Sequence, residues 1–384
     1  MKIPFNKPTA VGAELANITD ALARGHLAGD GHYTKRCHQW LEERLGCRRA
    51  LLTHSCTGAL DMAAILCDLA PGDEVIMPSY TFVSTANAFA LRGAVPVFVD
   101  IRADTLNIDE RLIEAAVSPR TRAIAVVHYA GVACEMDTIL AIARRHKLLV
   151  VEDAAQALLA TYKQRMLGTL GQLGCVSFHE TKNVLSGEGG ALLVNDERLV
   201  ERAEIVREKG TNRSRFLRGE VDKYTWVDLG SSYLPSELNA AFLEAQLAHA
   251  DEVMARRRAV WARYRAGLSE LAASGVLELP CEPPAGCISN GHIFYVMADT
   301  LATRMALAAH LKARDMLSVS HYVPLHSSPA GRKWGRTSGE LTVTDAVAER
   351  LLRLPLYFAL ADAQVDAVID AVKEFFATRA AARP

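Results

Sequence analysis

The 384-residue sequence predicts an α/β protein with a mainly parallel sheet. Short apolar runs rich in β-branched residues alternate with segments of helical length from about residue 49 onwards. Repetition of strand, helix and strand at this interval favours right-handed crossovers, which cover a parallel sheet with helices. Half of the residues are hydrophobic, and the chain is long enough to bury the core that such a sheet needs.

Seven strands are expected in this first part of the chain. Helices with apolar spacing near 3.6 residues lie between most of the first five strands, for example at 57–69 and 136–146. The last two strands have only a short connection between them, so the sheet is expected to be mixed. The strands are "ALLT" at 50–53, "EVIMP" at 74–78, "VPVFVD" at 95–100, "AIAVVHY" at 123–129, "LLVVED" at 148–153, "CVSF" at 175–178 and "ALLV" at 191–194.

The pattern changes after about residue 235. Ser236 can cap a long helical segment that runs to about Leu268. Two strand-like runs, "HIFYVMA" and "LSVSHYV", follow with a helix around 302–314 between them, and a last helix is expected near 362–377. The sequence therefore predicts a large domain at residues 1–245 and a smaller α+β domain at residues 246–384.

Composition excludes several classes of function. The net charge of −1 gives no bulk attraction to nucleic acid or to an anionic membrane. The eight cysteines form no C-x-x-C pair and no metal-type pairing with histidine, so we expect reduced thiols and no metal site. The first residues lack a signal-peptide pattern, and no apolar run approaches the ~18 residues that span a bilayer. The expectation is a soluble, cytoplasmic protein.

Candidate functional residues follow the expected strands, because ligands of open α/β sheets bind beyond the carboxyl ends of the strands. Ser55, Cys56 and Thr57 stand where the first strand turns into a helix, and the free N–H groups of such a turn suit a phosphate. The same residues are also typical of an ordinary helix cap. Asp153 ends an apolar strand, where a carboxylate needs a cationic partner or caps the next helix.

A single lysine, Lys182, lies between "CVSF" and the glycines of "GEGG". At the mouth of the sheet its amine could lose hydration, acquire a lowered pKa and act as a nucleophile, although most lysines simply face water. The aromatic Phe82 follows the second strand. Pyridoxal phosphate needs these four features: a phosphate cradle, a partner for the pyridine nitrogen, a platform for the ring and a Schiff-base lysine.

Longer motifs carry a resemblance to a known family over nearly the whole chain. They are "IPFNKP", "GDEVIMPSYTFVSTANA", "VHYAGVACEMD", "VVEDAAQA", "SFHETKN", "GEGG", "HYVPLH" and "RLPLY". With these motifs the chain resembles the DegT-type sugar-nucleotide aminotransferases, which are pyridoxal-phosphate enzymes with the fold of aspartate aminotransferase. The resemblance implies an active site between the two domains and at least a homodimer around two shared sites.

The resemblance also implies a role for each matching residue. Lys182 would bind the cofactor as a Schiff base and Asp153 would pair with its ring nitrogen. Gln156 would lie near the ring hydroxyl, and Phe82 would stack on the ring. The phosphate would be held by the backbone of Cys56 and by Thr57 and Ser177.

The chain departs from the family pattern at two positions. Cys56 stands where many members have glycine or alanine, which is harmless if only its backbone contacts the phosphate. Leu234 stands where many members have an asparagine that reaches the phosphate of a neighbouring subunit, so that contact is in doubt here.

The substrates follow from the resemblance alone. It implies L-glutamate as amino donor and a dTDP-linked keto sugar, dTDP-4-dehydro-6-deoxyglucose, as acceptor at C4. The product would be dTDP-4-amino-4,6-dideoxygalactose for surface polysaccharides. Residues that read the nucleotide or sugar cannot be derived, and the candidates are Tyr322, His326, Lys209 and Arg213.

Four alternatives stay open at this stage. A related aminotransferase could act at C3 or give the gluco epimer at C4. Relatives that dehydrate sugars replace the lysine with histidine, whereas this chain keeps Lys182. A nicotinamide enzyme would need G-x-G-x-x-G after the first strand, which "HSCTGAL" lacks. A binding module without catalysis is the fourth.

Overall fold

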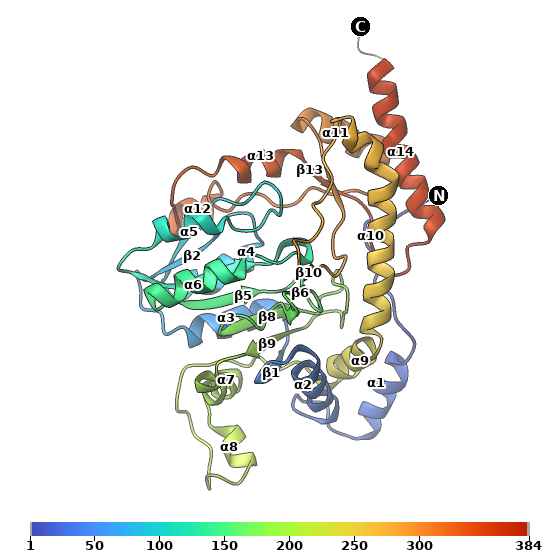
Figure 1. The fold of residues 1–384 in the computed structure, drawn as a ribbon. Helices are drawn as coiled ribbons and strands as arrows, with labels where there is room; N and C mark the ends of the chain where they lie inside the picture. The colour runs from blue at the N-terminus through green and yellow to red at the C-terminus, as the bar shows by residue number, and fades with distance from the viewer. Residues whose placement is uncertain (1, 382–384) are drawn as a thin grey trace.

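A single eight-stranded sheet forms the centre of the molecule in the computed structural model, which describes residues 2–381 (Figure 1). The strand order is β1-β9-β8-β5-β4-β2-β3-β12. Only β9 runs antiparallel to its neighbours; the other strands are parallel to one another. The strands are β1 (Arg49–Thr53), β2 (Glu74–Pro78), β3 (Val95–Val99), β4 (Thr121–Val127), β5 (Leu149–Asp153), β8 (Leu173–Ser177), β9 (Gly190–Val194) and β12 (Arg336–Thr337).

The expected seven strands and the mixed sheet are confirmed. The eighth strand, β12, comes from the C-terminal part of the chain and pairs with β3 at the edge of the sheet. Its two residues are not apolar, so no alternation of apolar residues in the sequence predicts this strand. It is held by Arg336, whose guanidinium donates to the buried carboxylate of Glu74 at 2.8 and 3.0 Å.

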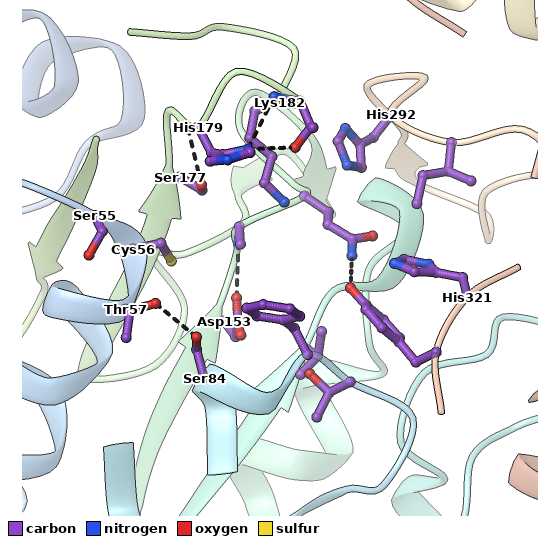
Figure 2. A pocket seen from close by; sticks show the side chains of 18 of the residues that line it. Ser55, Cys56, Thr57, Ser84, Asp153, Ser177, His179, Lys182, His292 and His321 are labelled. Carbon is purple, nitrogen blue, oxygen red and sulfur yellow. Dashed lines mark hydrogen bonds between the residues drawn. The ribbon is translucent and has the colours of Figure 1, made fainter. Parts of the chain in front are cut away.

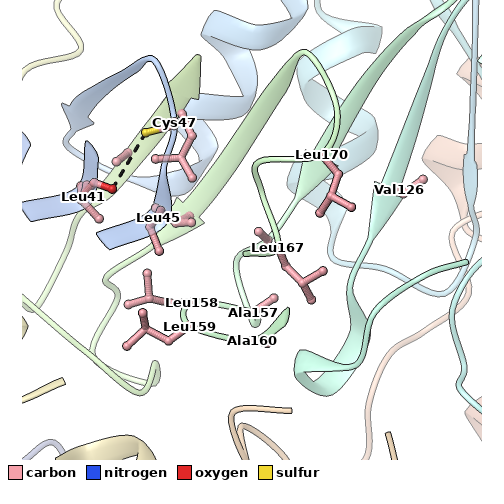
Figure 3. Packing of buried hydrophobic residues seen from close by; sticks show 14 of the residues in the cluster. Leu41, Leu45, Cys47, Val126, Ala157, Leu158, Leu159, Ala160, Leu167 and Leu170 are labelled. Atoms are coloured by element: carbon pink, nitrogen blue, oxygen red, sulfur yellow. Dashed lines mark hydrogen bonds between the residues drawn. The ribbon is translucent and has the colours of Figure 1, made fainter. Parts of the chain in front are cut away.

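Helices cover both faces of the sheet because alternate strand residues point to opposite sides. One face packs against α2 (His32–Leu45), α5 (Glu110–Ala116), α6 (Met136–His146) and α9 (Glu237–Ala248). Figure 3 shows part of this packing, where Leu41 and Leu45 of α2 and the buried segment around Leu158 and Leu167 contribute to one hydrophobic cluster. The other face packs against α3 (Cys56–Leu66), α4 (Val83–Ala90) and α7 (Val200–Arg207).

A second hydrophobic core lies in the C-terminal part of the chain. It is built from α10 (Ala250–Ala273), α11 (Leu301–Lys312), α14 (Asp362–Ala381) and the strand pair β11 (Tyr295–Met297) and β13 (Leu351–Arg353), and it includes Ile3. The long helices α10 and α14 pack side by side (Figure 1). Three shorter elements, α12 (Pro329–Trp334), α13 (Thr342–Arg350) and β12, return to the large sheet.

The remaining elements complete the fold. The N-terminal helix α1 (Glu14–Ala23) contacts α9. A small sheet contains β6 (Thr161–Tyr162), β7 (Arg165–Met166) and β10 (Cys287–Ile288), and short 3-10 turns stand at Tyr129–Gly131 and Glu197–Leu199. The helix α8 (Arg213–Leu217) lies on a segment, residues 209–227, that projects from the body of the molecule (Figure 1). This is called the projecting segment below.

Two expectations about the C-terminal part need correction. The long helix expected from Ser236 is two helices, α9 and α10, which meet at His249. The break lets α9 pack on the sheet while α10 packs in the second core. The run "LSVSHYV" forms no strand, because its only ladder contact is a single bridge between Val319 and Arg353.

The boundary between residues 245 and 246 falls inside α9 and stays a prediction. Among residues 2–381, no helix is both long and apolar enough to cross a membrane.

Candidate active site

A cavity of about 350 Å³ opens at the carboxyl ends of the parallel strands (Figure 2). The segments after β1, β2, β5 and β8 line one side of it, and residues of the C-terminal part line the other. Its lining includes every residue that the sequence assigned to the cofactor: Cys56, Thr57, Phe82, Asp153, Gln156, Ser177 and Lys182. One of the four proposed substrate residues, Tyr322, also lines it.

Lys182 stands in the loop that joins β8 to β9. This loop is held by backbone hydrogen bonds from Phe178 to Gly189 (2.9 Å) and from Ser186 to Phe178 (2.7 Å). Burial lowers the pKa of Lys182, although Cys56 and Asp153 act in the opposite direction, and Arg353 lowers it further. A larger fraction of this amine is therefore neutral and nucleophilic near pH 7 than in an exposed lysine.

Asp153 ends β5 and is only 5% exposed. Thr85 donates its hydroxyl proton to one carboxylate oxygen at 2.7 Å, and the amide of Ala155 donates to the other at 3.1 Å. Thr81 in turn lies 2.9 Å from the Thr85 hydroxyl. A carboxylate oxygen can accept more than one hydrogen bond, so Asp153 is oriented and still able to accept a further proton donor from the cavity.

The first turn of α3 offers a second set of donors. Ser55 caps the helix by accepting from the amide of Gly58 at 3.0 Å, and the preceding first-turn amides have no partner within the helix. Thr57 bonds Ser84 of α4 at 2.8 Å, which brings two hydroxyls together in the cavity that Ser177 also lines (Figure 2). Amides, hydroxyls and the positive end of a helix dipole at one place suit a phosphate.

Gly190 of β9 lies directly against the first turn of α3. A Cβ atom at Gly190 would lie 2.4 Å from the amide nitrogen of Cys56, which is closer than van der Waals contact allows. The strand β9 can therefore approach α3 only because residue 190 has no side chain. Burial raises the pKa of the Cys56 thiol well above its usual value, so this thiol is neutral.

Gln156, Tyr322 and Phe82 form the wall opposite α3. The side-chain oxygen of Gln156 accepts from the amide of Ala130 at 2.7 Å, and its nitrogen donates to the Tyr322 hydroxyl at 2.7 Å. The Tyr322 hydroxyl accepts this bond, so its own proton remains available for another acceptor. The Phe82 ring is 55% exposed, and its centroid is 6.5 Å from that of Tyr322.

Three of the proposed substrate residues do not line this cavity. His326 lies 2.8 Å from the Ser79 hydroxyl and 3.5 Å from Asp345. Lys209 and Arg213 both pair with Glu208 and belong to the segment that projects from the body. Their roles stay predictions, and so does the consequence of Leu234, whose side chain packs against Gly29.

Several lining residues were not assigned from the sequence. Ser84 of α4 lines the cavity, and its neighbour Thr85 does not line it but bonds Asp153. Both hydroxyls are indistinguishable in sequence from those of ordinary helix residues. His292 contacts Asn183 at 2.7 Å, and burial together with Lys182 and Arg257 holds its pKa well below the usual value. A signal was available for Arg353, because a charged residue there interrupts the apolar run that ends in "RLPLY".

The donors present fit pyridoxal phosphate. The hydroxyls and amides around α3 match its phosphate, the oriented carboxylate of Asp153 matches its ring nitrogen, and the Lys182 amine matches its aldehyde. These groups face one cavity, and Figure 2 shows Lys182 and Asp153 directed into it.

Comparison with known proteins agrees with this arrangement. Residues 8–373 match the model of the DegT/DnrJ/EryC1/StrS aminotransferase family. The spore coat polysaccharide biosynthesis protein SpsC of Bacillus subtilis is 34% identical over 97% of this chain and 96% of its own length. GDP-perosamine synthase of Caulobacter vibrioides is 31% identical over 97% and 98% of the two chains. The crystal structure of the aminotransferase TlmJ from Streptoalloteichus hindustanus is 33% identical, covers 98% of this chain and 100% of its own, and superposes with a TM-score of 0.91.

The family match extends over nearly the whole chain, and the relatives are similar over almost their full lengths. The chain therefore belongs to the DegT/DnrJ/EryC1/StrS aminotransferase family, a family of sugar aminotransferases that depend on pyridoxal 5'-phosphate.

Proposed function

We propose that this aminotransferase moves the amino group of L-glutamate to C4 of dTDP-4-dehydro-6-deoxyglucose, which makes it a dTDP-4-amino-4,6-dideoxygalactose transaminase. The observation that supports transamination best is the placement of Lys182 and Asp153 on one cavity, with the pKa of the lysine lowered by burial. The choice of sugar rests on the full-length resemblance of the sequence motifs.

Different residues of this chain bind the cofactor and transfer the proton in the proposed reaction. Thr57, Ser177 and the first turn of α3 bind the phosphate, and Asp153 holds the proton on the ring nitrogen. Bound pyridoxal phosphate supplies an electron sink for the electron pair that remains when a proton leaves the carbon bearing the amine. Lys182 acts as acid and base, because its Nζ takes up that proton and returns it.

A different nucleotide is the second candidate. The relative named GDP-perosamine synthase is 31% identical over almost its full length, which favours a GDP-linked sugar as the alternative. A change of position or of configuration, to C3 or to the gluco product at C4, is the other variation of the same reaction.

The second subunit belongs to the proposal. Lys209 and Arg213 do not line the cavity of their own chain and belong to the projecting segment, which has exposed apolar side chains such as Trp226, which is 75% exposed. We propose a homodimer in which this segment reaches the site of the partner, where these cations bind the nucleotide. Tyr322 and His326 would contact the sugar.

The test is a comparison of acceptors. The enzyme loaded with pyridoxal phosphate is incubated with L-glutamate and dTDP- or GDP-linked 4-keto-6-deoxy sugars, or a dTDP-linked 3-keto sugar, and the products are analysed by 1H NMR. Amination of the dTDP-linked 4-keto sugar with small couplings between H4 and both ring neighbours, meaning an axial amine, is expected. The Lys182→Ala variant is the control without turnover. Large diaxial couplings would move the function to the gluco epimer, and exclusive use of the GDP sugar would move it to the second candidate.

A further inference from the structure

Arg353 is a cavity residue for which the proposed cofactor has no use. It ends β13, where its backbone exchanges hydrogen bonds with Val319 at 2.8 and 3.2 Å and its Cα pairs with that of Tyr295 on β11. The base of the side chain is thus fixed by neighbouring segments on both sides. The side chain extends to the cavity that also contains Lys182.

The guanidinium of Arg353 is poorly satisfied. Its Nε is fully buried and has no hydrogen-bond partner among the described residues, and one terminal nitrogen donates to the Ser320 carbonyl at 3.3 Å. One face lies 4.8 Å from the centre of the Phe5 ring. Within residues 2–381, no carboxylate is within ion-pair distance of it.

The other arginine of the cavity provides a contrast. Arg257 also has no carboxylate partner in the described part of the chain, but it donates to the carbonyl oxygens of Gly291, His292 and Leu356 at 2.8 to 3.3 Å. These bonds join three segments, which is a structural role. Among the residues that the structure describes, the guanidinium of Arg353 has only the one long bond to Ser320, so most of its donors are free for a ligand.

A partly buried cation without a counter-ion has lost hydration that nothing replaces, and an anion that enters the cavity offsets that loss. Burial lowers the pKa of Arg353, and the guanidinium still stays charged at neutral pH. Its planar fork of N–H groups matches a carboxylate with two parallel hydrogen bonds. The cavity thus contains an anion receptor that is separate from the α3 turn.

The position of Arg353 indicates which anionic group of the two substrates it binds, the carboxylate of the amino donor or the phosphates of the nucleotide sugar. Arg353 and Lys182 line the same cavity. Burial is the main cause that lowers the pKa of Lys182, and the charge of Arg353 lowers it further. In an α-amino acid the carboxylate is attached to the very carbon that bears the reacting amine. The phosphates of a nucleotide sugar are attached across the ring from C4, so they belong farther from Lys182.

We propose that Arg353 binds the α-carboxylate of the amino donor and thereby restricts the first half-reaction to α-amino acids. The inference rests on the proposed transamination and adds the specificity for the donor. Because the sugar acceptor has no carboxylate at this place, the second half-reaction does not depend on Arg353.

The experiment measures the two half-reactions separately by the visible absorbance of the cofactor. In Arg353→Met, kcat/KM for L-glutamate is expected to fall about 10- to 100-fold, the range for a lost hydrogen bond to a charged group. For 4-aminobutyrate, which is glutamate without its α-carboxylate, the wild-type enzyme is expected to be slow and the variant no slower. Arg353→Lys keeps the charge without the fork and should give an intermediate value.

A binding measurement complements the rates. Calorimetric titration of the holoenzyme with 2-oxoglutarate should give a dissociation constant about 10- to 100-fold weaker in Arg353→Met. Arg350→Met is the matched control, since Arg350 lies three residues away, pairs with Glu278 and does not line the cavity. It should leave both half-reactions and the dissociation constant unchanged.

Three outcomes would overturn the assignment. Equal losses with glutamate and 4-aminobutyrate would mean that Arg353 is structural, and a loss confined to the sugar half-reaction would mean that it binds a phosphate. An unchanged preference for glutamate would mean that it binds neither. Failure of the proposed acceptor is distinguishable, because the donor half-reaction proceeds without any sugar.

Discussion

Burial at single residues determines the chemistry of this site. Lys182, His292 and His321 line the same cavity, and burial is the largest cause that lowers the pKa of each of them. A site with neutral bases suits proton transfer at neutral pH. The free-energy cost of burying the charged Lys182 amine can be measured on the cofactor-free protein.

The pH dependence of stability should reveal the lowered pKa of Lys182. Between that pKa and the unfolded value of 10.5, the unfolded chain binds a proton that the folded chain does not. The contribution of Lys182 to the free energy of unfolding therefore rises with pH through this window and is constant above it. Urea unfolding of the cofactor-free protein and of Lys182→Met, from neutral pH upwards, should give a difference in free energy of unfolding, wild type minus variant, that rises through this window, because the other titrating groups are common to both chains. Parallel curves would contradict the assignment.

The hydrogen bonds of Asp153 predict a graded series of variants. Asp153→Asn should keep bound cofactor and lose turnover, because an amide cannot hold the ring nitrogen protonated; the lost charge-assisted bond is worth ~2–4 kcal/mol. Thr85→Val removes the bond at 2.7 Å that orients the carboxylate and should cost about 1 kcal/mol in the same half-reaction. Thr81→Val removes a hydroxyl that bonds Thr85 and not Asp153 itself, so it should cost less. Single-turnover rates check the order, and equal rates in all three variants would refute the pairing.

At the scale of elements, the site depends on the close approach of β9 to α3. Gly190 permits that approach, and Ser55 fixes where the helix begins. Two elements that are far apart in the sequence therefore set the position of the phosphate donors together.

Gly190→Ala should displace the first turn of α3. The added Cβ would meet backbone atoms of Ser55 and Cys56 at 2.4 to 2.7 Å, and overpacking of this kind costs about 1–3 kcal/mol. We expect the dissociation constant of pyridoxal phosphate to rise by about 5- to 150-fold, which is this cost converted to affinity. Gly72→Ala is the control: its φ of +89° brings strain, but its surroundings are open and remote from the cavity. It should lower stability and leave the affinity unchanged. Equal affinities in the two variants would show that the spacing is unimportant.

At the scale of the molecule, the exposed apolar side chains of the projecting segment call for a partner surface. Leu217, Tyr224, Trp226 and Val227 are all more than half exposed. A single chain leaves this area in water, whereas a homodimer could cover it.

Mixed dimers test whether Arg213 acts in the partner's site. Lys182→Ala and Arg213→Ala are each expected to be inactive or strongly impaired alone. After the two are unfolded and refolded together, one site of each mixed dimer is intact, so about a quarter of wild-type activity should return. Refolding each variant alone is the control. A mixture no more active than its components would show that Arg213 serves its own chain or has no role.

The sequence by itself determined the order of strands and helices, because the periods of its apolar residues distinguish a buried strand from a helix. It also predicted that Lys182, Asp153 and Phe82 lie together, because each ends or follows a strand whose carboxyl end must lie at the ligand edge of the sheet, and all three line one cavity. These are local signals that a linear pattern can carry.

The tertiary structure decided what depends on contacts between distant segments. The eighth strand comes from Arg336 and Thr337, which have no apolar pattern and are held by an ion pair to Glu74. The break at His249 arises because α9 and α10 pack in different cores. The sequence shows Arg353 only as a charge within an apolar run, and its buried Nε without a partner exists only where Phe5, Ser320 and the strand β13 meet. Burial and the absence of a partner are properties of the folded surroundings, so no pattern along the chain encodes them directly.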